Sequence, residues 1–150
     1  RRMFKSIVVG IDGSDPSNTA ITVASDLANK YGSALHIVHT PQPQTVAFAM
    51  GAAAGYHVAT TMPSEDEVDE AANELITRAT ELAKISGKTI AGTQIKRGEP
   101  ADQIVKYAKA HGCDLIVTGR RGLGSVSGLI LGSTTQRINH TAECACLSVI

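Results

Sequence analysis

The sequence has few aromatic residues: no tryptophan, two phenylalanines and three tyrosines among 150 residues. The interior must therefore be filled by Val, Ile, Leu and Ala, which favours an α/β fold with buried, aliphatic parallel strands. An excess of charge of one sign is also missing, because 14 basic and 14 acidic residues give a net charge of zero. We therefore expect no nucleic-acid partner, since nonspecific binding to phosphate backbones needs a positive excess.

Cysteine is scarce and odd in number: Cys113, Cys144 and Cys146. Three thiols cannot all pair, so the sequence predicts structural thiols in a reducing, cytoplasmic compartment. Cys144-x-Cys146 does not have the spacing of a zinc site and has no second Cys/His pair, so no metal site is predicted. No apolar run reaches the roughly 20 residues of a membrane span, and the run at 6–11 is too short for a signal peptide.

Short aliphatic runs alternate with segments of helical periodicity. The runs predict five strands, at residues 4–11, 34–39, 89–95, 114–118 and 146–150. Between them, capping residues and glycines predict four helices, at about 15–31, 64–86, 99–111 and 133–140. This order predicts a single α/β domain over residues 1–150, with a doubly wound parallel sheet and helices on both faces.

The order of the strands determines where a ligand would bind. With the order 3-2-1-4-5, the direction of winding reverses between the first and the fourth strand, and ligands of such sheets bind there, beyond the carboxyl ends. Asp12-Gly13 and Gly119 follow these two strands. The sequence therefore predicts that they share one crevice.

Residues 40–63 have a different composition from the rest, with no Asp, Glu, Lys or Arg and many Ala, Gly, Pro and Thr. A long irregular connection in a compact domain is usually functional or disordered. The composition does not decide between a lid over the site and a mobile insert.

The stretch 119–133 is rich in glycine, with Arg120 and Arg121 and no acidic residue. Its exposed backbone N–H groups beside positive charge suit a phosphate. Ser133 is predicted to cap the next helix with Gln136 as its capping-box partner, which places a helix N-terminus at the end of the loop. A flexible linker is the alternative, although the apolar residues 129–131 disfavour it. The two arginines either neutralise phosphate charge or are solvated.

Several known phosphate-binding signatures are absent. The P-loop pattern G-x-x-x-x-G-K-[ST] does not occur, and the first strand ends in Gly10-Ile11-Asp12-Gly13 rather than in a dinucleotide fingerprint. A phospho-receiver domain would need an acidic residue at the end of the third strand, where Lys96 and Arg97 stand.

The loop does resemble that of one family. Gly119-x2-Gly122-x9-Gly132-Ser133 is similar to the nucleotide loop of the ATP-binding subclass of universal stress proteins. The resemblance extends to residues 7–14, 35–38, 98–100 and 114–119. It implies the 3-2-1-4-5 sheet, ATP binding, and often a homodimer formed through the last strand. Ala145 departs from the pattern, because the family often has proline there.

Carried over by position, the resemblance implies a set of nucleotide-binding residues. Asp12, Gly13 and the backbone near Ile37 would hold the adenosine, while Gly119 and Gly122 would meet ribose and phosphates. Gly132 and Ser133 would bind phosphate, and Gly124 and Ser125 are further candidates inside the loop. Two alternatives stay open at this point: Asp12 as a helix cap and Ile37 as a core residue.

The functional prediction is an ATP-binding regulatory module with at most slow hydrolysis. No catalytic residue is predicted: the loop has no acidic residue, Asp12 is the one plausible site carboxylate, and no lysine stands in a phosphate-binding context. His36 lies within a strand and His140 at a helix end. The alternatives are a slow ATPase or nucleotidyl-transfer enzyme, and a scaffold without ligand. ATP with or without Mg²⁺, AMP and other adenine nucleotides all fit the same residues.

Overall fold

The computed structural model describes residues 3–42, 62–120 and 133–150. The described elements follow the predicted alternation. They are β1 Ser6–Ile11, α1 Asp15–Tyr31, β2 Ala34–His39, α3 Glu65–Ile85, β3 Gly92–Ile95, α4 Pro100–Ala110, β4 Leu115–Gly119, α5 Ser133–Thr141 and β5 Ala145–Val149. The strands form one parallel sheet in the order β3-β2-β1-β4-β5, so the predicted α/β fold and strand order are confirmed.

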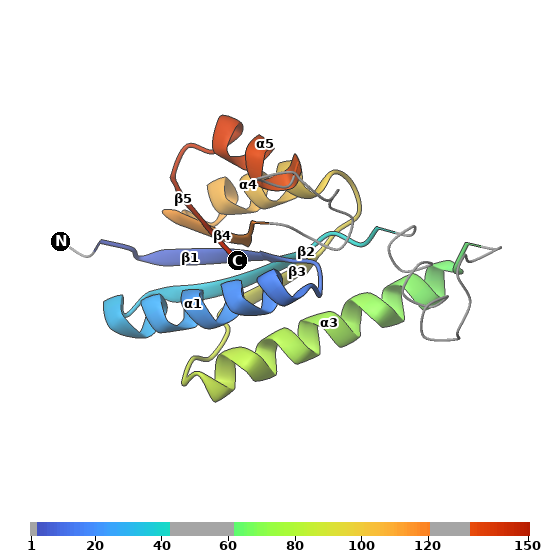
Figure 1. The fold of residues 1–150 in the computed structure, drawn as a ribbon, viewed down its shortest axis with the longest axis horizontal. Coiled ribbons are helices and arrows are strands. Elements are labelled where there is room, and N and C mark those ends of the chain that lie inside the picture. Colours follow the sequence, from blue (N-terminus) through green and yellow to red (C-terminus); the bar gives the residue numbers. More distant parts are fainter. Residues whose placement is uncertain (1–2, 43–61, 121–132) are drawn as a thin grey trace.

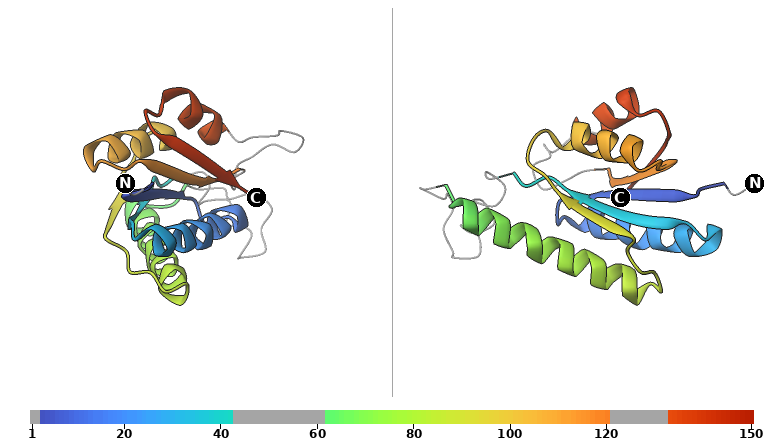
Figure 2. Two further views of the ribbon diagram at one scale, coloured as in Figure 1. Left: turned by 90° about the vertical axis from the view of Figure 1, so that its left-hand side faces the viewer. Right: turned by 180° about the vertical axis from the view of Figure 1, so that it is seen from behind.

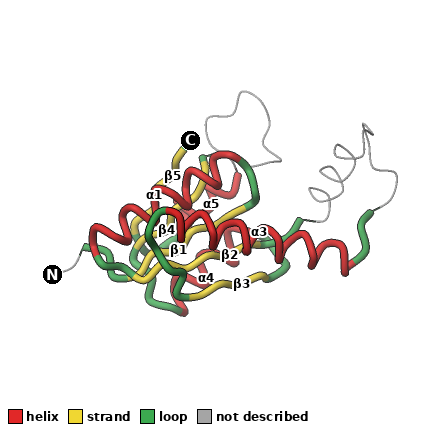
Figure 3. The backbone as a smooth tube through the Cα atoms, turned by 90° about the horizontal axis from the view of Figure 1, so that it is seen from below, coloured by secondary structure: helices red, strands yellow, loops and turns green. Residues whose placement is uncertain are grey.

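Helices cover both faces of the sheet. Helices α1 and α3 lie below it and α4 and α5 above it in Figure 1, and the views in Figure 2 show the same layers from the side and from behind. Figure 3 looks at the face that α1 and α3 cover. Two hydrophobic clusters fill these layers, and β1 supplies both: Ile7, Val9 and Ile11 pack towards α1 and α3, and Val8 packs towards α4.

The central strand β1 joins segments that are far apart in the sequence. It pairs with β2, where Ile11 is opposite His39, and with β4, where Gly10 is opposite Thr118. At the start of the strands the Asp114 carboxylate accepts hydrogen bonds from the backbone N–H groups of Lys5 and Ser6, at 3.0–3.1 Å. This contact helps to fix the register of β1 against β4.

The helix caps agree with the sequence in most places. Ser14 caps α1 by accepting a hydrogen bond from the Ser17 N–H, and Gly32 ends the helix in the left-handed conformation. Ser64 and Glu67 form the predicted capping box at the start of α3. These caps satisfy backbone groups that the helix leaves without a partner.

Several predicted boundaries need correction, among them that of β4, which spans Leu115–Gly119 rather than 114–118. The structure begins β1 at Ser6 rather than residue 4, and β3 at Gly92 rather than residue 89. The register of β3 with β2 begins at Gly92, opposite His36, and the Ala91 N–H already donates to the Leu35 carbonyl at 2.7 Å. The last strand spans Ala145–Val149 rather than 146–150. Ser133 is the first residue of α5 and not the cap that precedes it.

All three cysteines lie in the described part, and none forms a disulfide there. Cys113 is buried in the cluster under α4, and Cys144 and Cys146 pack against the same cluster. Burial raises the pKa of Cys144 to about 11, so its thiol is protonated at neutral pH. The positions agree with the prediction of structural thiols.

Among the described helices none is both long enough and apolar enough to cross a bilayer.

Candidate functional site

The candidate site lies at the carboxyl edge of the sheet, where β1 and β4 run side by side. Gly10 of β1 pairs with Thr118 of β4. The next residues along the chain, Asp12 just after β1 and Gly119 at the end of β4, therefore lie near each other. The first turn of α5 lies on the same edge, since the Thr135 hydroxyl donates a hydrogen bond to the Gly119 carbonyl at 3.0 Å. The residues that were predicted to share one crevice therefore lie at the same edge of the sheet, with the first turn of α5 beside them.

Asp12 is held in place by the start of α1. Its Oδ1 accepts a hydrogen bond from the Ser14 N–H at 2.9 Å, and its own N–H donates to the Ser17 hydroxyl at 3.1 Å. Ser14, and not Asp12, is the cap of α1. Asp12 therefore braces the turn between β1 and α1, and its side chain is half-buried at the edge.

Two glycines of the predicted site stand where a side chain would not fit. Gly13 has φ +85°, and a Cβ there would lie 2.7 Å from Leu75 Cδ2. A Cβ on Gly119 would lie 2.8 Å from the Pro16 carbonyl carbon and 3.0 Å from the Ser17 nitrogen. The glycine at 119 thus lets β4 approach the first turn of α1, which is the turn that holds Asp12.

Ile37 lies inside β2, paired with Val9 on one side and Thr93 on the other. Its side chain is fully buried in the cluster under α1 and α3, as the core-packing alternative expects. The residue that leaves the sheet at the end of β2 is Thr40, which directly follows His39.

The His39 side chain links the ends of β1 and β2 by a hydrogen bond. Its Nδ1 lies 2.8 Å from the Ile11 carbonyl oxygen, so Nδ1 carries the proton and donates this bond. Burial lowers the pKa of His39 below its ordinary value of 6.5, although the Ile11 carbonyl and the Asp12 charge act in the opposite direction. Burial also lowers the pKa of His36, which hydrogen-bonds the Tyr107 hydroxyl, and nearby His111 lowers it further.

These lowered pKa values predict a pH-dependent stability. The folded state binds fewer protons than the unfolded state, so the stabilisation is complete above pH 6.5 and is lost as the pH falls below that value. The slope is at most about 1.4 kcal/mol per pH unit for each histidine. Urea unfolding of wild type and His39→Asn, at several pH values between 5 and 8, would measure it. We expect the asparagine variant to have the shallower slope, and equal slopes would contradict the role given to His39.

Two polar atoms at this edge stand out, and sequence reasoning had named only one of their residues, Arg120, as a possible phosphate partner. Within the described ranges, the buried side-chain atoms without a hydrogen-bond partner are Thr40 Oγ1 and Arg120 Nε. Each residue follows the end of its strand directly, as Asp12 does. Asking which polar residue comes first after each strand would have found both.

Five of the predicted site residues lie in the described part: Asp12, Gly13, Ile37, Gly119 and Ser133. Ser133 is exposed in the first turn of α5, close to the edge. Gly122, Gly124, Ser125 and Gly132 lie outside the described residues, as do Arg121 and residues 43–61, so their roles stay predictions.

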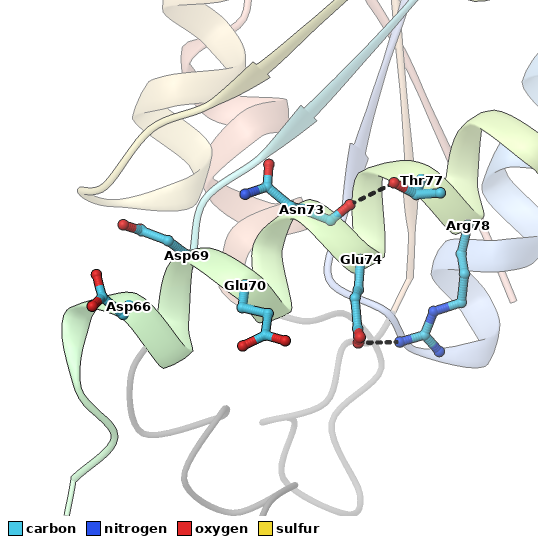
Figure 4. Close-up of a pocket in the computed structure, with 7 residues that line it drawn as sticks. All are labelled: Asp66, Asp69, Glu70, Asn73, Glu74, Thr77 and Arg78. Carbon is cyan, nitrogen blue, oxygen red and sulfur yellow. Dashed lines mark hydrogen bonds and ion pairs between the residues drawn. The ribbon is translucent and has the colours of Figure 1, made fainter.

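A second concave surface runs along the outer side of α3 (Figure 4). Its lining residues are exposed and mostly acidic: Asp66, Asp69, Glu70, Asn73, Glu74, Thr77 and Arg78. Arg78 is the only cation among them, and it lies 3.7 Å from Glu74. Four carboxylates repel an anionic ligand, so this surface does not compete with the carboxyl edge as a phosphate site.

The comparison with protein families decides the classification. Residues 3–149 match the family model described as "Universal stress protein family". The chain belongs to this family. The relatives of this universal stress protein include a Thermus aquaticus protein described as "Universal stress protein in QAH/OAS sulfhydrylase 3'region", 34% identical over 98% of this chain and 99% of the relative. Another is "Universal stress protein YxiE" of Bacillus subtilis, 32% identical over the same shares.

Solved structures support the same fold. A universal stress protein in complex with cAMP is 25% identical, with a TM-score of 0.69 over 98% of this chain and 97% of that chain. The universal stress protein from Archaeoglobus fulgidus in complex with dAMP is 20% identical, with a TM-score of 0.69 over 99% of both chains, and this likeness shows the fold alone.

Proposed function

We propose that this universal stress protein binds an adenine nucleotide, ATP in particular, at the carboxyl edge of β1 and β4. The observation that carries the proposal is the meeting of Asp12, Gly119 and the N-terminus of α5 at one place. An acidic acceptor suits ribose hydroxyls or the adenine amine, and a helix N-terminus suits phosphate. A family member described in complex with cAMP supports an adenine ligand.

The orientation of the ligand follows from the same edge. Its phosphates would lie towards β4 and α5, near Gly119, Ser133 and the glycines at 122 and 132. Its adenosine would lie towards β2, near Asp12 and the backbone that follows Ile37. An accompanying Mg²⁺ would be held mainly by the phosphates and water, because Asp12 is the one carboxylate that the proposal places there.

The proposal describes a regulatory module rather than an efficient enzyme. Hydrolysis needs a positioned base or a group that orients water, together with metal ligands. The Asp12 carboxylate is already engaged with the Ser14 N–H, and His39 Nδ1 with the Ile11 carbonyl. We expect hydrolysis to be slow, so that nucleotide occupancy itself would carry the signal in a cytoplasmic protein.

Self-association is a further part of the proposal. β5 lies at the end of the sheet, with β4 on one side only. An edge strand presents unpaired backbone groups that a second copy can pair with, so we propose a homodimer through this strand. Light scattering on the purified protein at several concentrations would measure the mass, and a monomer throughout would refute the dimer.

The decisive experiment identifies the ligand. The purified protein would be denatured and any released small molecule identified by mass spectrometry, and ATP, AMP and cAMP would be titrated by calorimetry and thermal shift. ATP at one hundred times its dissociation constant should stabilise the fold by about 2.7 kcal/mol. Gly122→Glu and Gly132→Val should abolish binding while the fold is retained, because each blocks the approach of the phosphates. Gly112→Ala is the control for lost stability, because its φ of +62° strains a side chain although no atom lies within 4 Å of the added Cβ, and it should bind as wild type does.

The alternatives predict different results. A scaffold without ligand would release no nucleotide and show no shift with any of the three. An ATPase would turn over well above the buffer rate and lose this activity in Asp12→Ala. Unchanged affinity in both glycine variants would show that the site is elsewhere.

A further inference from the structure

Thr40, Asp12 and Arg120 stand in one row across β2, β1 and β4. Asp12 and Thr40 are each one step beyond the last pair of β1 and β2, which joins Ile11 to His39. Arg120 is two steps beyond Thr118, as Asp12 is two steps beyond its partner Gly10. Neighbouring parallel strands are about 4.8 Å apart, so the row spans roughly 10 Å.

The alternation along β2, β1 and β4 directs positions 40, 12 and 120 to one face of the sheet, although each lies just beyond its strand and Asp12 Oδ1 turns to the Ser14 N–H. Val8, Val38 and Ile116 pack into the cluster under α4 and α5. Side chains alternate along a strand, so the even count from Val8 to Asp12, from Val38 to Thr40 and from Ile116 to Arg120 leads to that face again. The first turn of α5 lies on this face too, since Ile138 packs into the same cluster and the Thr135 hydroxyl bonds the Gly119 carbonyl.

Two members of the row carry buried polar atoms without a partner in the described part of the chain. Thr40 is 6% exposed, and its hydroxyl has no hydrogen bond there. The Arg120 Nε atom is also buried without a partner there, although Arg120 as a whole is half-buried and its backbone N–H is bonded to the Val149 carbonyl. Buried polar groups are nearly always hydrogen-bonded, so each such atom needs an explanation. A ligand that contacts both atoms would explain why two such atoms lie at the same edge of the sheet.

The chemistry of the row differs from end to end. At the β2 end, Thr40 offers a neutral hydroxyl that both donates and accepts. At the β4 end, Arg120 offers a guanidinium, whose N–H groups suit phosphate. The N-terminus of α5 is near the β4 end of the row, because the Thr135 hydroxyl donates a hydrogen bond to the Gly119 carbonyl. A nucleoside with a 5′-phosphate matches this order, with its uncharged part at β2 and its anionic part at β4.

We propose that Thr40 and Arg120 contact the ligand directly. The Thr40 hydroxyl hydrogen-bonds the nucleoside, and the Arg120 guanidinium binds its phosphate through Nε and the adjacent nitrogens. The inference rests on the proposed function and adds two side chains to a site otherwise built from backbone groups and Asp12. It also gives one of the two arginines of the loop a role, because Arg120 is assigned to the ligand.

The test uses two variants and three ligands. Thr40→Val and Arg120→Gln would be titrated with ATP, AMP and adenosine by calorimetry. Thr40→Val should weaken all three ligands alike, by ~3- to 10-fold, because it removes one neutral hydrogen bond. Arg120→Gln should weaken ATP and AMP by ~10- to 100-fold and leave adenosine unchanged, because adenosine has no phosphate. Thr22→Val on α1 and Arg78→Gln on α3 are the matched controls, both at exposed positions.

A second readout separates a ligand contact from a structural role. Removing an unpartnered buried hydroxyl should raise the melting temperature of the ligand-free protein, so Thr40→Val should bind less tightly and unfold at a higher temperature. A lower melting temperature would mean that the hydroxyl has a partner in the fold, and this would overturn the inference. Equal losses for adenosine and ATP in Arg120→Gln would overturn it as well. Absence of binding by the wild type to all three ligands would refute the proposed function itself. Normal binding by the wild type with unaffected variants would refute only the assignment of Thr40 and Arg120.

Discussion

Gly119→Ala is expected to lower both the free energy of unfolding and the affinity for nucleotide. The added Cβ would lie 2.8 Å from the Pro16 carbonyl carbon and 3.0 Å from the Ser17 nitrogen, which are backbone atoms of α1. Backbone atoms in a capped first turn cannot move aside as the end of a flexible side chain can. Overpacking of this kind typically costs about 1–3 kcal/mol.

The loss of affinity follows from what Ser17 does. Its N–H is bonded to the Ser14 cap, and its hydroxyl accepts the N–H of Asp12. Displacing the turn that contains Ser17 therefore displaces Asp12, and a loss of ~1.4 kcal/mol in binding is a tenfold weaker affinity. Urea unfolding and calorimetric titration with ATP would measure the two effects on the same preparation.

Gly92→Ala is the matched control for this prediction. A Cβ there would lie 3.0 Å from His36 Nδ1 and from the Tyr107 hydroxyl, at the start of β3 and away from the candidate site. We expect it to destabilise the fold with little change in affinity. If both alanine variants bind ATP as wild type does, the contact between β4 and α1 does not position the site.

Gly10→Ala is expected to destabilise the protein through its contact with α4, and a second substitution should restore it. A Cβ at position 10 would lie 2.3 Å from Ile104 Cδ1 and 3.1 Å from its Cγ1. Ile104 is 4% exposed, so its end has little room to move. We expect Gly10→Ala alone to cost about 1–3 kcal/mol, and Ile104→Val alone about 0.5–1.5 kcal/mol.

The double variant distinguishes a steric contact from a general loss of packing. Ile104→Val removes Cδ1, the atom with which the new methyl group clashes. The double variant should therefore be more stable than the sum of the two single effects, with an interaction of ~1 kcal/mol or more in urea unfolding. Strict additivity would show that Gly10 is required for another reason.

The fold could be predicted from the sequence because its local signals agree with one another. The capping box of Ser64 and Glu67, the Gly32 end of α1 and the aliphatic runs of β1, β2 and β4 each specified an element that the structure contains. The third strand was predicted three residues too long, because Thr89 and Ile90 have strand propensity whereas the strand in the structure begins at Gly92. Ser133 was predicted to be the cap before α5 but is its first residue. The local sequence does not determine which of the polar residues at a helix N-terminus is the first helical one.

The candidate site was predicted less completely. Asp12 and Gly119 could be placed together, because the resemblance implied the strand order 3-2-1-4-5 that the structure has. The adenosine side was assigned to Ile37 by resemblance, and the structure places that side chain in the core. Thr40 could not be ranked above it from sequence, since its lack of a hydrogen-bond partner is a property of the packed edge.

The pairing of β1 with β4 has a consequence for how the chain acquires its structure during synthesis. The strand at the centre of the sheet is made first, yet its partners Leu115 to Thr118 are made more than a hundred residues later. Until they leave the ribosome, β1 has one unpaired, largely apolar edge that can pair with other nascent chains. Translation arrest or truncation before residue 115 should therefore yield aggregates, whereas stopping after β4 should yield a sheet whose centre is already closed.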